Sequence, residues 1–193
     1  INIEKDFLKS QLNPHFLFNT LNNLYALSLE SSNKVPDVII KLSGLMEYVL
    51  YDVKGTKFVP LIKEIEYIQN YIEIERLRFE NVEVAINLES NIEDIKVPPL
   101  LFISLIENAF KHGGLNNKKL KIKINCKIVK NTLHFEILNN FVLSQNIKTK
   151  KGIGLINTKK RLKLIFQNDF RLDQKIKFNY YIICLKIPTQ NEN

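Results

Sequence analysis

The spacing of the apolar residues changes once along this chain, and the change divides the predicted fold into two parts. Over roughly the first 80 residues, apolar positions recur every three to four residues, which is typical of packed helices. From residue 82 onward, segments of alternating apolar and polar residues occur between further helical segments. The order helix, strand, helix, two strands, helix, two strands predicts an α+β fold with helices on one face of a mixed sheet.

The first part is predicted to be a helical hairpin. A helix over 3–31 is followed by a turn at 32–36 and a second helix over 37–52. Both helices carry apolar residues on more than one side, so two antiparallel helices leave some of these residues uncovered. We therefore expect two copies of the chain to form a dimeric four-helix bundle.

The second part follows a break at 54–56 and begins with a linking helix. We expect a helical-hairpin domain over 1–54 and a second domain over 55–193, which includes the linking helix at 60–79. The remaining predicted elements are a strand at 82–88, a helix at 99–111, hairpin strands at 121–129 and 133–138, a helix at 154–166, and strands at 171–177 and 180–188.

The charge of the chain does not indicate nucleic-acid binding. The 193 residues carry a net charge of +8, with a pI near 9.3. The basic residues are scattered and cluster only at 118–123 and 148–161, without interleaved aromatic residues or a known nucleic-acid motif. We therefore expect no nucleic-acid partner; a solvated surface or a rim that handles phosphate explains the clusters better.

The cysteines and the start of the chain bear on its location. Cys126 and Cys184 lie far apart in predicted strands, without the spacing of a metal site, so we expect two reduced core residues in a cytosolic environment. The chain has no apolar run of about 18 residues. Because it begins at Ile1 in what reads as mid-helix, we expect the cytoplasmic portion of an inner-membrane protein, attached through an upstream segment.

His15 directly follows Pro14 within the first predicted helix. Proline in a helix interior costs about 3 kcal/mol and favours a kink, which would present the imidazole prominently. An exposed imidazole can act as a nucleophile, although a surface or dimer-interface histidine without chemistry is the simpler interpretation of these residues alone. The helical spacing predicts a buried stripe and a polar face, formed respectively by Leu8, Leu12, Phe16, Leu21 and Leu24 and by Gln11, His15 and Asn19.

A second group of polar residues ends the predicted helix at 99–111. Asn108 and Lys111 are three residues apart and share a face, with Glu107 and His112 beside them. An amide oxygen suits Mg²⁺, and a neighbouring lysine suits phosphate oxygens. The alternative is an ordinary helix C-terminus, where lysine and histidine complement the dipole and Gly113 forms the cap. The segment alone favours this alternative.

A third group contains Gly152 and Gly154, just before or at the start of the helix at 154–166. Two glycines at a helix N-terminus allow backbone N–H groups to approach phosphate oxygens. The alternative is a simple turn, because the segment lacks the further glycines of the dinucleotide and P-loop motifs.

Taken together and in this order, these stretches resemble the LytS/YehU-type sensor histidine kinases. The catalytic part of that family has a Bergerat-type α/β sandwich, shared with gyrase, the Hsp90 chaperone and MutL. The resemblance covers essentially the whole chain, with the phosphoacceptor motif at 8–24, the linking helix at 61–79, the N-box at 106–113 and the G-box at 151–162.

The resemblance implies roles for individual residues. His15 corresponds to the autophosphorylated residue and Asn108 to the Mg²⁺ ligand, while Lys111 would face the nucleotide phosphates and His112 would line the pocket. Arg161 and Asn157 also match the family pattern, although they equally fit a role in anchoring the lid helix. The nucleotide-binding residues implied at the end of the ATP lid are Gly152, Gly154 and Leu155.

Two positions, Ser104 and Glu107, bear on the reaction that the resemblance implies. In the related ATPases, the glutamate that activates water lies one turn before the metal-binding asparagine, and here that residue is Ser104. Water activation is therefore not expected. Glu107 either positions or deprotonates His15 or faces solvent.

The chain departs from the family where adenine is read. The usual Asp-x-Gly is replaced by Asn139, Asn140 and Phe141. Asn139 can still accept a hydrogen bond from the adenine amino group, but without a charge, so we expect a lower affinity for ATP. The lid at 140–151 is short and polar, and we expect it to be disordered without nucleotide.

The sequence therefore predicts a homodimeric histidine kinase core that uses ATP and Mg²⁺. It would phosphorylate His15 and pass the phosphoryl group to an aspartate of a response regulator. The alternative is a degenerate, non-catalytic dimeric scaffold with weak or no nucleotide binding, which Asn139 supports. An ATPase of the gyrase type is disfavoured by Ser104.

Overall fold

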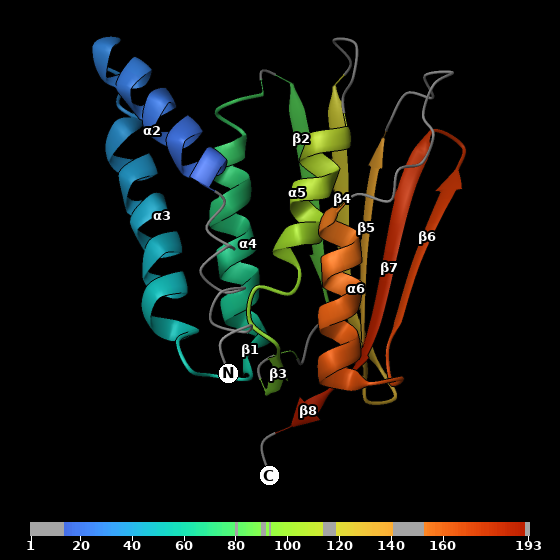
Figure 1. The fold of residues 1–193 in the computed structure, drawn as a ribbon. Coiled ribbons are helices and arrows are strands. Elements are labelled where there is room, and N and C mark those ends of the chain that lie inside the picture. The colour runs from blue at the N-terminus through green and yellow to red at the C-terminus, as the bar shows by residue number, and fades with distance from the viewer. Residues whose placement is uncertain are drawn as a thin grey trace. The chain divides into compact units, whose positions relative to one another are not determined.

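The computed structural model describes residues 14–79, 81–89, 92, 94–113, 119–140 and 153–191 (Figure 1). The chain forms two compact units, one of residues 1–80 with 98–100 and the other of residues 81–97 with 101–193. Packing thus groups the predicted linking helix with the helical hairpin. Along the chain, the main boundary between the units lies near residue 80, whereas the sequence analysis divides the chain at residue 54.

The first unit is helical, and its three main helices correspond to the predicted segments. The described part of α2 starts at Pro14, and proline is tolerated in a first helical turn because its missing N–H has no partner there. The kink predicted at Pro14 depends on residues outside the described part of the chain. The elements are α2 (Pro14–Leu29), α3 (Val35–Glu47), a π-helical turn η1 (Tyr48–Asp52), the short strand β1 (Val59–Pro60) and α4 (Leu61–Glu75).

The buried stripe predicted on α2 is only partly correct. Phe16 is buried and stacks on Tyr71 of α4, with ring centroids 4.7 Å apart, and Thr20 one turn later is also buried. Leu21, predicted to be buried, is 47% exposed. Five residues separate it from Phe16, a rotation of about 140° around the helix, so it faces away from α4.

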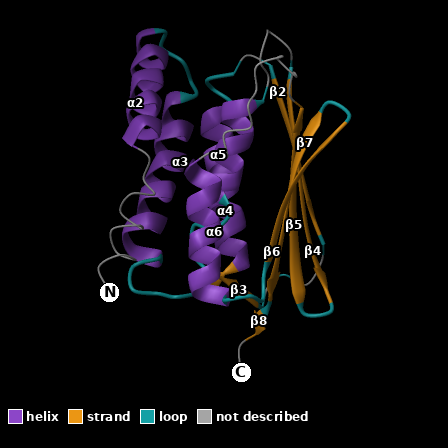
Figure 2. Cartoon of the chain, turned by 45° about the vertical axis from the view of Figure 1, so that its right-hand side comes forward, coloured by secondary structure: helices purple, strands orange, loops and turns teal. Residues whose placement is uncertain are grey.

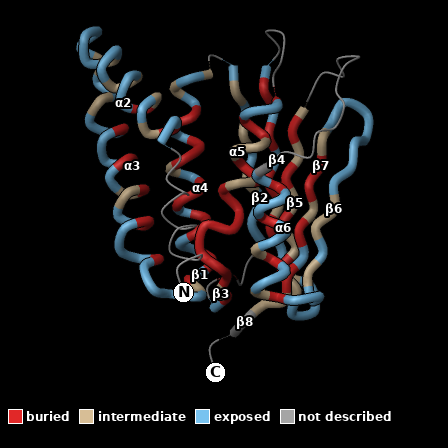
Figure 3. The backbone as a smooth tube through the Cα atoms, viewed as in Figure 1, coloured by how far each residue is buried: buried red, intermediate tan, exposed pale blue. Residues whose placement is uncertain are grey.

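Many residues of the helical hairpin are exposed (Figure 3), and several of them are large and apolar. The prediction that two helices leave apolar residues uncovered is confirmed for this chain. The exposed apolar residues of α2 and α3 are Phe18, Leu21, Tyr25, Leu29, Ile39 and Ile40.

A buried carboxylate joins three segments of the first unit. One oxygen of Glu64, which is fully buried on α4, accepts hydrogen bonds from the Tyr48 hydroxyl and the Leu100 backbone N–H, each at 2.5 Å. Burial, and then the negative charge of Glu64, raise the pKa of Tyr48. Leu100 has a φ of 54°, which is unfavourable for a residue with a β-carbon. The hydrogen bond that Leu100 donates to Glu64 thus holds the segment that leads into the next helix.

The second unit is a five-stranded mixed sheet with two helices on one face (Figure 2). The strand order is β2-β4-β5-β7-β6, with β2 parallel to β4 and the other pairs antiparallel. The predicted α+β fold is therefore confirmed. The elements are β2 (Val82–Leu88), α5 (Ile103–His112), β4 (Leu120–Val129), β5 (Thr132–Asn140), α6 (Ile153–Phe166), β6 (Arg171–Lys177) and β7 (Tyr180–Pro188).

The core of this unit lies between the sheet and the helices. Alternate residues of β4 and β5 point inward and are buried, as their apolar pattern predicts. Phe102, just before α5, stacks on Phe135 of β5 with a centroid distance of 4.3 Å. The hairpin between β4 and β5 turns at Lys130 and Asn131, both with positive φ, which matches the twist of the flanking strands.

Some boundaries differ from the prediction. The helix expected at 99–111 begins only at Ile103, because residues 98–100 pack with the first unit. The sequence analysis also missed β3 (Ile95–Val97) and β8 (Gln190–Asn191), which pair antiparallel and are too short to show a pattern. Both cysteines are free, with Cys126 buried and Cys184 half-buried. In the described part of the chain, no helix is both long and apolar enough to span a bilayer.

Candidate functional site

Three elements of the second unit bring most of the predicted nucleotide-binding residues together. Helix α5 contacts both β5 and α6. Its last turns carry Asn108 and Lys111, β5 ends with Asn139 and Asn140, and α6 begins near Gly154. Residues far apart in the sequence therefore meet at one end of the sheet. Gly152 and most of the predicted lid, 141–151, lie outside the described residues.

Gly113 fixes how closely α5 approaches the sheet. Its backbone is extended, and its N–H donates to the Ala109 carbonyl at 2.9 Å, so it is not a left-handed cap. A Cβ at this position would overlap the Leu120 side chain and lie 2.7 Å from the Ala109 oxygen and 3.4 Å from Nδ2 of Asn139. Glycine is required here by space, and it places the end of α5 against Asn139.

Asn139 is buried on the inner face of the sheet. It is 2% exposed, and its register partner on β7 is Tyr181. Its side-chain nitrogen donates to the Asn140 carbonyl at 3.2 Å. This bond does not use the side-chain oxygen, which is the atom that the adenine assignment requires. Asn140 itself joins β5 to β4, through bonds with the Lys121 N–H and the Lys119 carbonyl.

The polar residues of α5 differ in exposure. Glu107 and Asn108 are half-buried, whereas Lys111 and His112 are exposed. Partial burial, and then the positive charge of Lys111, lower the pKa of His112. A lower pKa favours the neutral form of His112, so Lys111 is the main cation at this end of α5.

At the start of α6, Gly154 is exposed and Leu155 is buried. A Cβ at Gly154 would meet no atom within 4 Å, so the backbone is accessible. Leu155 is buried, so a nucleotide contact at this position would involve its backbone. Asn157 is exposed and Arg161 is half-buried.

The sequence analysis missed a hydroxyl bridge between α5 and α6. Ser104 Oγ lies 2.7 Å from Thr158 Oγ1, and the Thr158 hydroxyl donates to the Gly154 carbonyl at 3.0 Å. Because Thr158 uses its proton on Gly154, Ser104 is the donor to Thr158. Ser104 lies one turn before Asn108, so the bridge holds the first turn of α6 against the helix that carries the predicted metal ligand. Serine and threonine are too common for this pairing to be visible in the sequence.

Replacing Thr158 by valine removes this bridge and keeps the shape of the side chain. We expect Thr158→Val to lower the free energy of unfolding by about 1–2 kcal/mol, because the half-buried Ser104 hydroxyl loses its acceptor. Thr158→Ser retains the hydroxyl and is the matched control. Urea unfolding measures both, and a Thr158→Val protein as stable as the parent would contradict the role of the bridge.

His15 is exposed on α2 of the first unit. The side-chain nitrogen of Asn19, one turn later, lies 3.0 Å from Nδ1 and 3.4 Å from Nε2 of its ring. The expected polar face is therefore present at these two positions, while Gln11 lies outside the described residues. Asn19 orients the imidazole, since an amide N–H donates to an unprotonated ring nitrogen. The expected role of Glu107 toward His15 stays a prediction, because Glu107 belongs to the other unit.

Another carboxylate, Glu75 of α4, belongs to the same unit as His15. Glu75 is 2% exposed and accepts two bonds from Arg78, at 2.7 and 3.0 Å. Burial raises its pKa, while the charges of Arg78 and, more weakly, His15 lower it. The sequence places Glu75 60 positions after His15, so only the packing of α2 on α4 reveals that they belong to one electrostatic environment.

Comparison with known proteins agrees with this architecture. Residues 3–82 match the model of the family described as histidine kinase. The chain is 31% identical to the sensor protein LytS of Oceanobacillus iheyensis over 86% of its length, and 29% identical to the sensor histidine kinase BtsS of Escherichia coli K12 over 98%. It spans 31% and 34% of those two proteins, about one third of their length.

Solved histidine kinase structures share the fold. The catalytic domain of the histidine kinase ThkA superimposes with a TM-score of 0.53 at 21% identity, covering 70% of this chain and 97% of that domain. The same kinase in complex with the response regulator protein TrrA gives a TM-score of 0.50 at 16% identity, covering 92% of this chain and 60% of that one. From its sequence relatives and its fold together, this chain belongs to the LytS/BtsS-type sensor histidine kinases of two-component signal transduction.

Proposed function

We propose that this chain is the kinase core of a sensor protein, which transfers the terminal phosphoryl group of ATP to His15. The observation that carries the proposal is the contact of α5, which carries Asn108 and Lys111, with β5, whose Asn139 lies against Gly113 at the end of α5. An amide ligand, a cation and a buried base-reading residue are three different requirements of one Mg-ATP site. Their convergence favours this function over an ordinary helix C-terminus.

The residues present fit Mg-ATP. ATP supplies the phosphoryl group, and Asn108 would hold Mg²⁺ while Lys111 neutralises phosphate oxygens. The close approach at Gly113 keeps these side chains near Asn139, which would read adenine. His15 would be the nucleophile: its unprotonated nitrogen forms the new N–P bond as the terminal P–O bond of ATP breaks. Ser104 donates to Thr158 and is no general base, which favours transfer to histidine over hydrolysis.

The proposed partners are a second copy of the chain and a response regulator. The exposed apolar residues of α2 and α3 support the dimer, since a four-helix bundle would cover them. The ThkA–TrrA complex supports a response regulator as the acceptor of the phosphoryl group. The much greater length of the LytS and BtsS relatives supports a sensory and membrane-attached part outside this chain.

Incubation with γ-labelled ATP and Mg²⁺, followed by acid treatment, tests the proposed activity. A phosphohistidine loses its label in acid, whereas phosphoserine and phosphothreonine keep it. Acid-labile incorporation is the expected result. A protein that takes up no label but dimerises would instead be the non-catalytic scaffold, which the missing charge at Asn139 favours.

Asn139 decides between these two functions. We expect Asn139→Ala to weaken ATP binding by about five- to 100-fold, because the adenine amino group loses its acceptor in a partly dry pocket. Asn139→Asp should bind ATP as well as the parent or more tightly, since a charged acceptor makes a stronger hydrogen bond. GTP, with an oxygen in place of the amino group, should bind less well than ATP. Calorimetry that finds equal affinities for ATP and GTP and no loss in Asn139→Ala would support the scaffold.

A further inference from the structure

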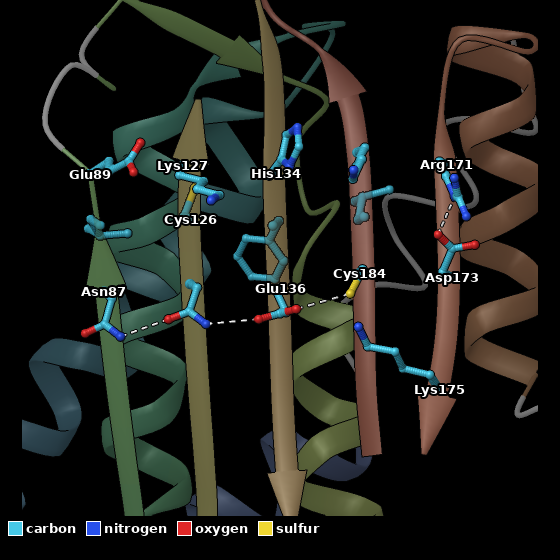
Figure 4. Close-up of a pocket in the computed structure, with 15 residues that line it drawn as sticks. Asn87, Glu89, Cys126, Lys127, His134, Glu136, Arg171, Asp173, Lys175 and Cys184 are labelled. Carbon is cyan, nitrogen blue, oxygen red and sulfur yellow. Dashed lines mark hydrogen bonds and ion pairs between the residues drawn. The ribbon is translucent and has the colours of Figure 1, made fainter. Parts of the chain in front are cut away.

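The outer face of the sheet, opposite α5 and α6, contains a cavity that the proposed kinase chemistry does not use. The cavity has a volume of 880 Å³ and is lined by residues of β2, β4, β5, β6 and β7 together with Glu89 (Figure 4). None of the predicted nucleotide-binding residues lines it. Within the described part of the second unit, both helices lie on the other face of the sheet (Figure 2).

Strand register arranges four basic residues of this face in one row, and Lys175 lies on the same face outside it. Lys127 on β4 is paired with His134 on β5, His134 with Lys186 on β7, and Lys186 with Arg171 on β6. Side chains of paired residues point to the same face, and neighbouring strands are about 4.8 Å apart. Four basic residues therefore cross the sheet in a line that spans roughly 14 Å. We call these four residues the basic row.

Three carboxylates line the cavity, Glu89, Glu136 and Asp173, and the last two have hydrogen-bond partners outside the centre of the basic row. Glu136 accepts hydrogen bonds from Asn125 at 3.1 Å and from the Cys184 thiol at 3.3 Å, and Asn87 extends this chain of bonds onto β2 (Figure 4). Asp173 is paired with Arg171 at 2.5 Å. Among the described residues, none of these three carboxylates forms an ion pair with Lys127, His134 or Lys186.

Three members of the basic row have no acidic partner. Among the described residues, Lys127, His134 and Lys186 form no ion pair and no side-chain hydrogen bond. Partial burial, and then the charges of Lys186 and Lys127, lower the pKa of His134. The two lysines flank the imidazole on the neighbouring strands, and an anion bound there would offset their charges.

We propose that the basic row is a docking surface for a carboxylate-rich segment of a partner protein. Charge complementarity carries the commitment to an anionic partner. The mixed lining favours a peptide over a polyphosphate or a lipid surface: Glu136 and Asp173 lie two positions along their strands from His134 and Arg171, and carboxylate oxygens can accept hydrogen bonds from the backbone N–H groups that only a peptide carries. A concave surface also fits a chain segment better than it fits a flat bilayer.

A short poly-glutamate peptide, a single-stranded DNA oligonucleotide and vesicles that contain phosphatidylserine are the probes. At low ionic strength we expect the full chain to bind poly-glutamate, and poly-glutamine of the same length not to bind. The double variant Lys127→Gln/Lys186→Gln should bind poly-glutamate about five- to tenfold more weakly, the effect of losing two partly exposed ion pairs. Bound peptide should also raise the pKa of His134, followed by NMR of its ring protons, and this rise should be lost in the variant.

The matched control is Lys57→Gln/Lys163→Gln, which removes the same charge from exposed positions outside the cavity. Its affinity for poly-glutamate should stay within about twofold of the parent. Equal weakening in both double variants would overturn the proposal, because it would indicate only the net positive charge of the chain. If the protein binds DNA or vesicles and not poly-glutamate, and this binding is weakened in Lys127→Gln/Lys186→Gln, the choice of a protein partner is overturned.

Discussion

Replacing His15 by glutamine is expected to abolish acid-labile phosphorylation, with a loss of at least ~1000-fold, because the variant has no nitrogen nucleophile. The side chain is exposed, so the free energy of unfolding should change by less than about 0.5 kcal/mol. The apolar residues proposed to form the dimer are untouched, and ATP affinity should stay at the parent's value. Labelling with γ-labelled ATP, calorimetry and light scattering measure the three quantities.

Two other histidines provide the controls for this experiment. His134 lies on the outer face of the sheet, so His134→Gln should retain the acid-labile label in full. His112→Gln should retain His15 as the acceptor, even where its place beside Lys111 alters nucleotide affinity. Persistent acid-labile label in the His15→Gln protein would assign the phosphoacceptor to another histidine and contradict the proposed role.

Replacing Asn108 by alanine is expected to remove the Mg²⁺ dependence of ATP binding and to slow autophosphorylation on the order of 100-fold. The physical reason is that the metal neutralises phosphate charge that Lys111 alone leaves uncompensated. The side chain is half-buried on α5, so the loss of folding stability should be small beside the loss of activity. Calorimetric titration with ATP, with and without Mg²⁺, gives the dependence directly.

Asn168→Ala is the matched control, because this asparagine is exposed beyond the end of α6. It should leave ATP binding, its Mg²⁺ dependence and the rate of labelling unchanged. An Asn108→Ala protein with the same Mg²⁺ dependence as the parent would remove Asn108 from the metal site. A parallel fall in activity and in the free energy of unfolding would indicate a structural role for Asn108 in place of a metal ligand.

Much of the architecture follows from local patterns in the sequence. Alternation of apolar residues specifies the strands of the sheet, because successive side chains of a strand point to opposite faces. The helices of both units follow from three- to four-residue periodicity. The motif residues His15, Asn108 and Gly154 are identified by their immediate neighbours, so their positions on α2, α5 and α6 required no tertiary information. The exposure of His15 was expected for the same reason.

What the sequence left open depends on contacts between distant segments. A hydrophobic stripe indicates only approximately which side of a helix faces its neighbours. Leu21 was wrongly predicted to be buried because the sequence does not show which surface this helix packs against. The reason for glycine at position 113 is the approach of Leu120 and Asn139, which local conformational preferences do not reveal. Helix boundaries such as Ile103 likewise follow from which unit the preceding residues pack against.

The sequence by itself determined most of the secondary structure, the fold class and the residues of the three motifs, since each of these is encoded by residues close together in the chain. Only the tertiary structure decided the bridge between Ser104 and Thr158, the burial of Glu64 and Glu75, and the basic row of the outer face. The bridge, the hydrogen bonds of Glu64 and the basic row each bring together residues many positions apart. Hydrogen bonds and charge interactions act over a few ångströms in space, and the fold alone determines which distant residues come that close.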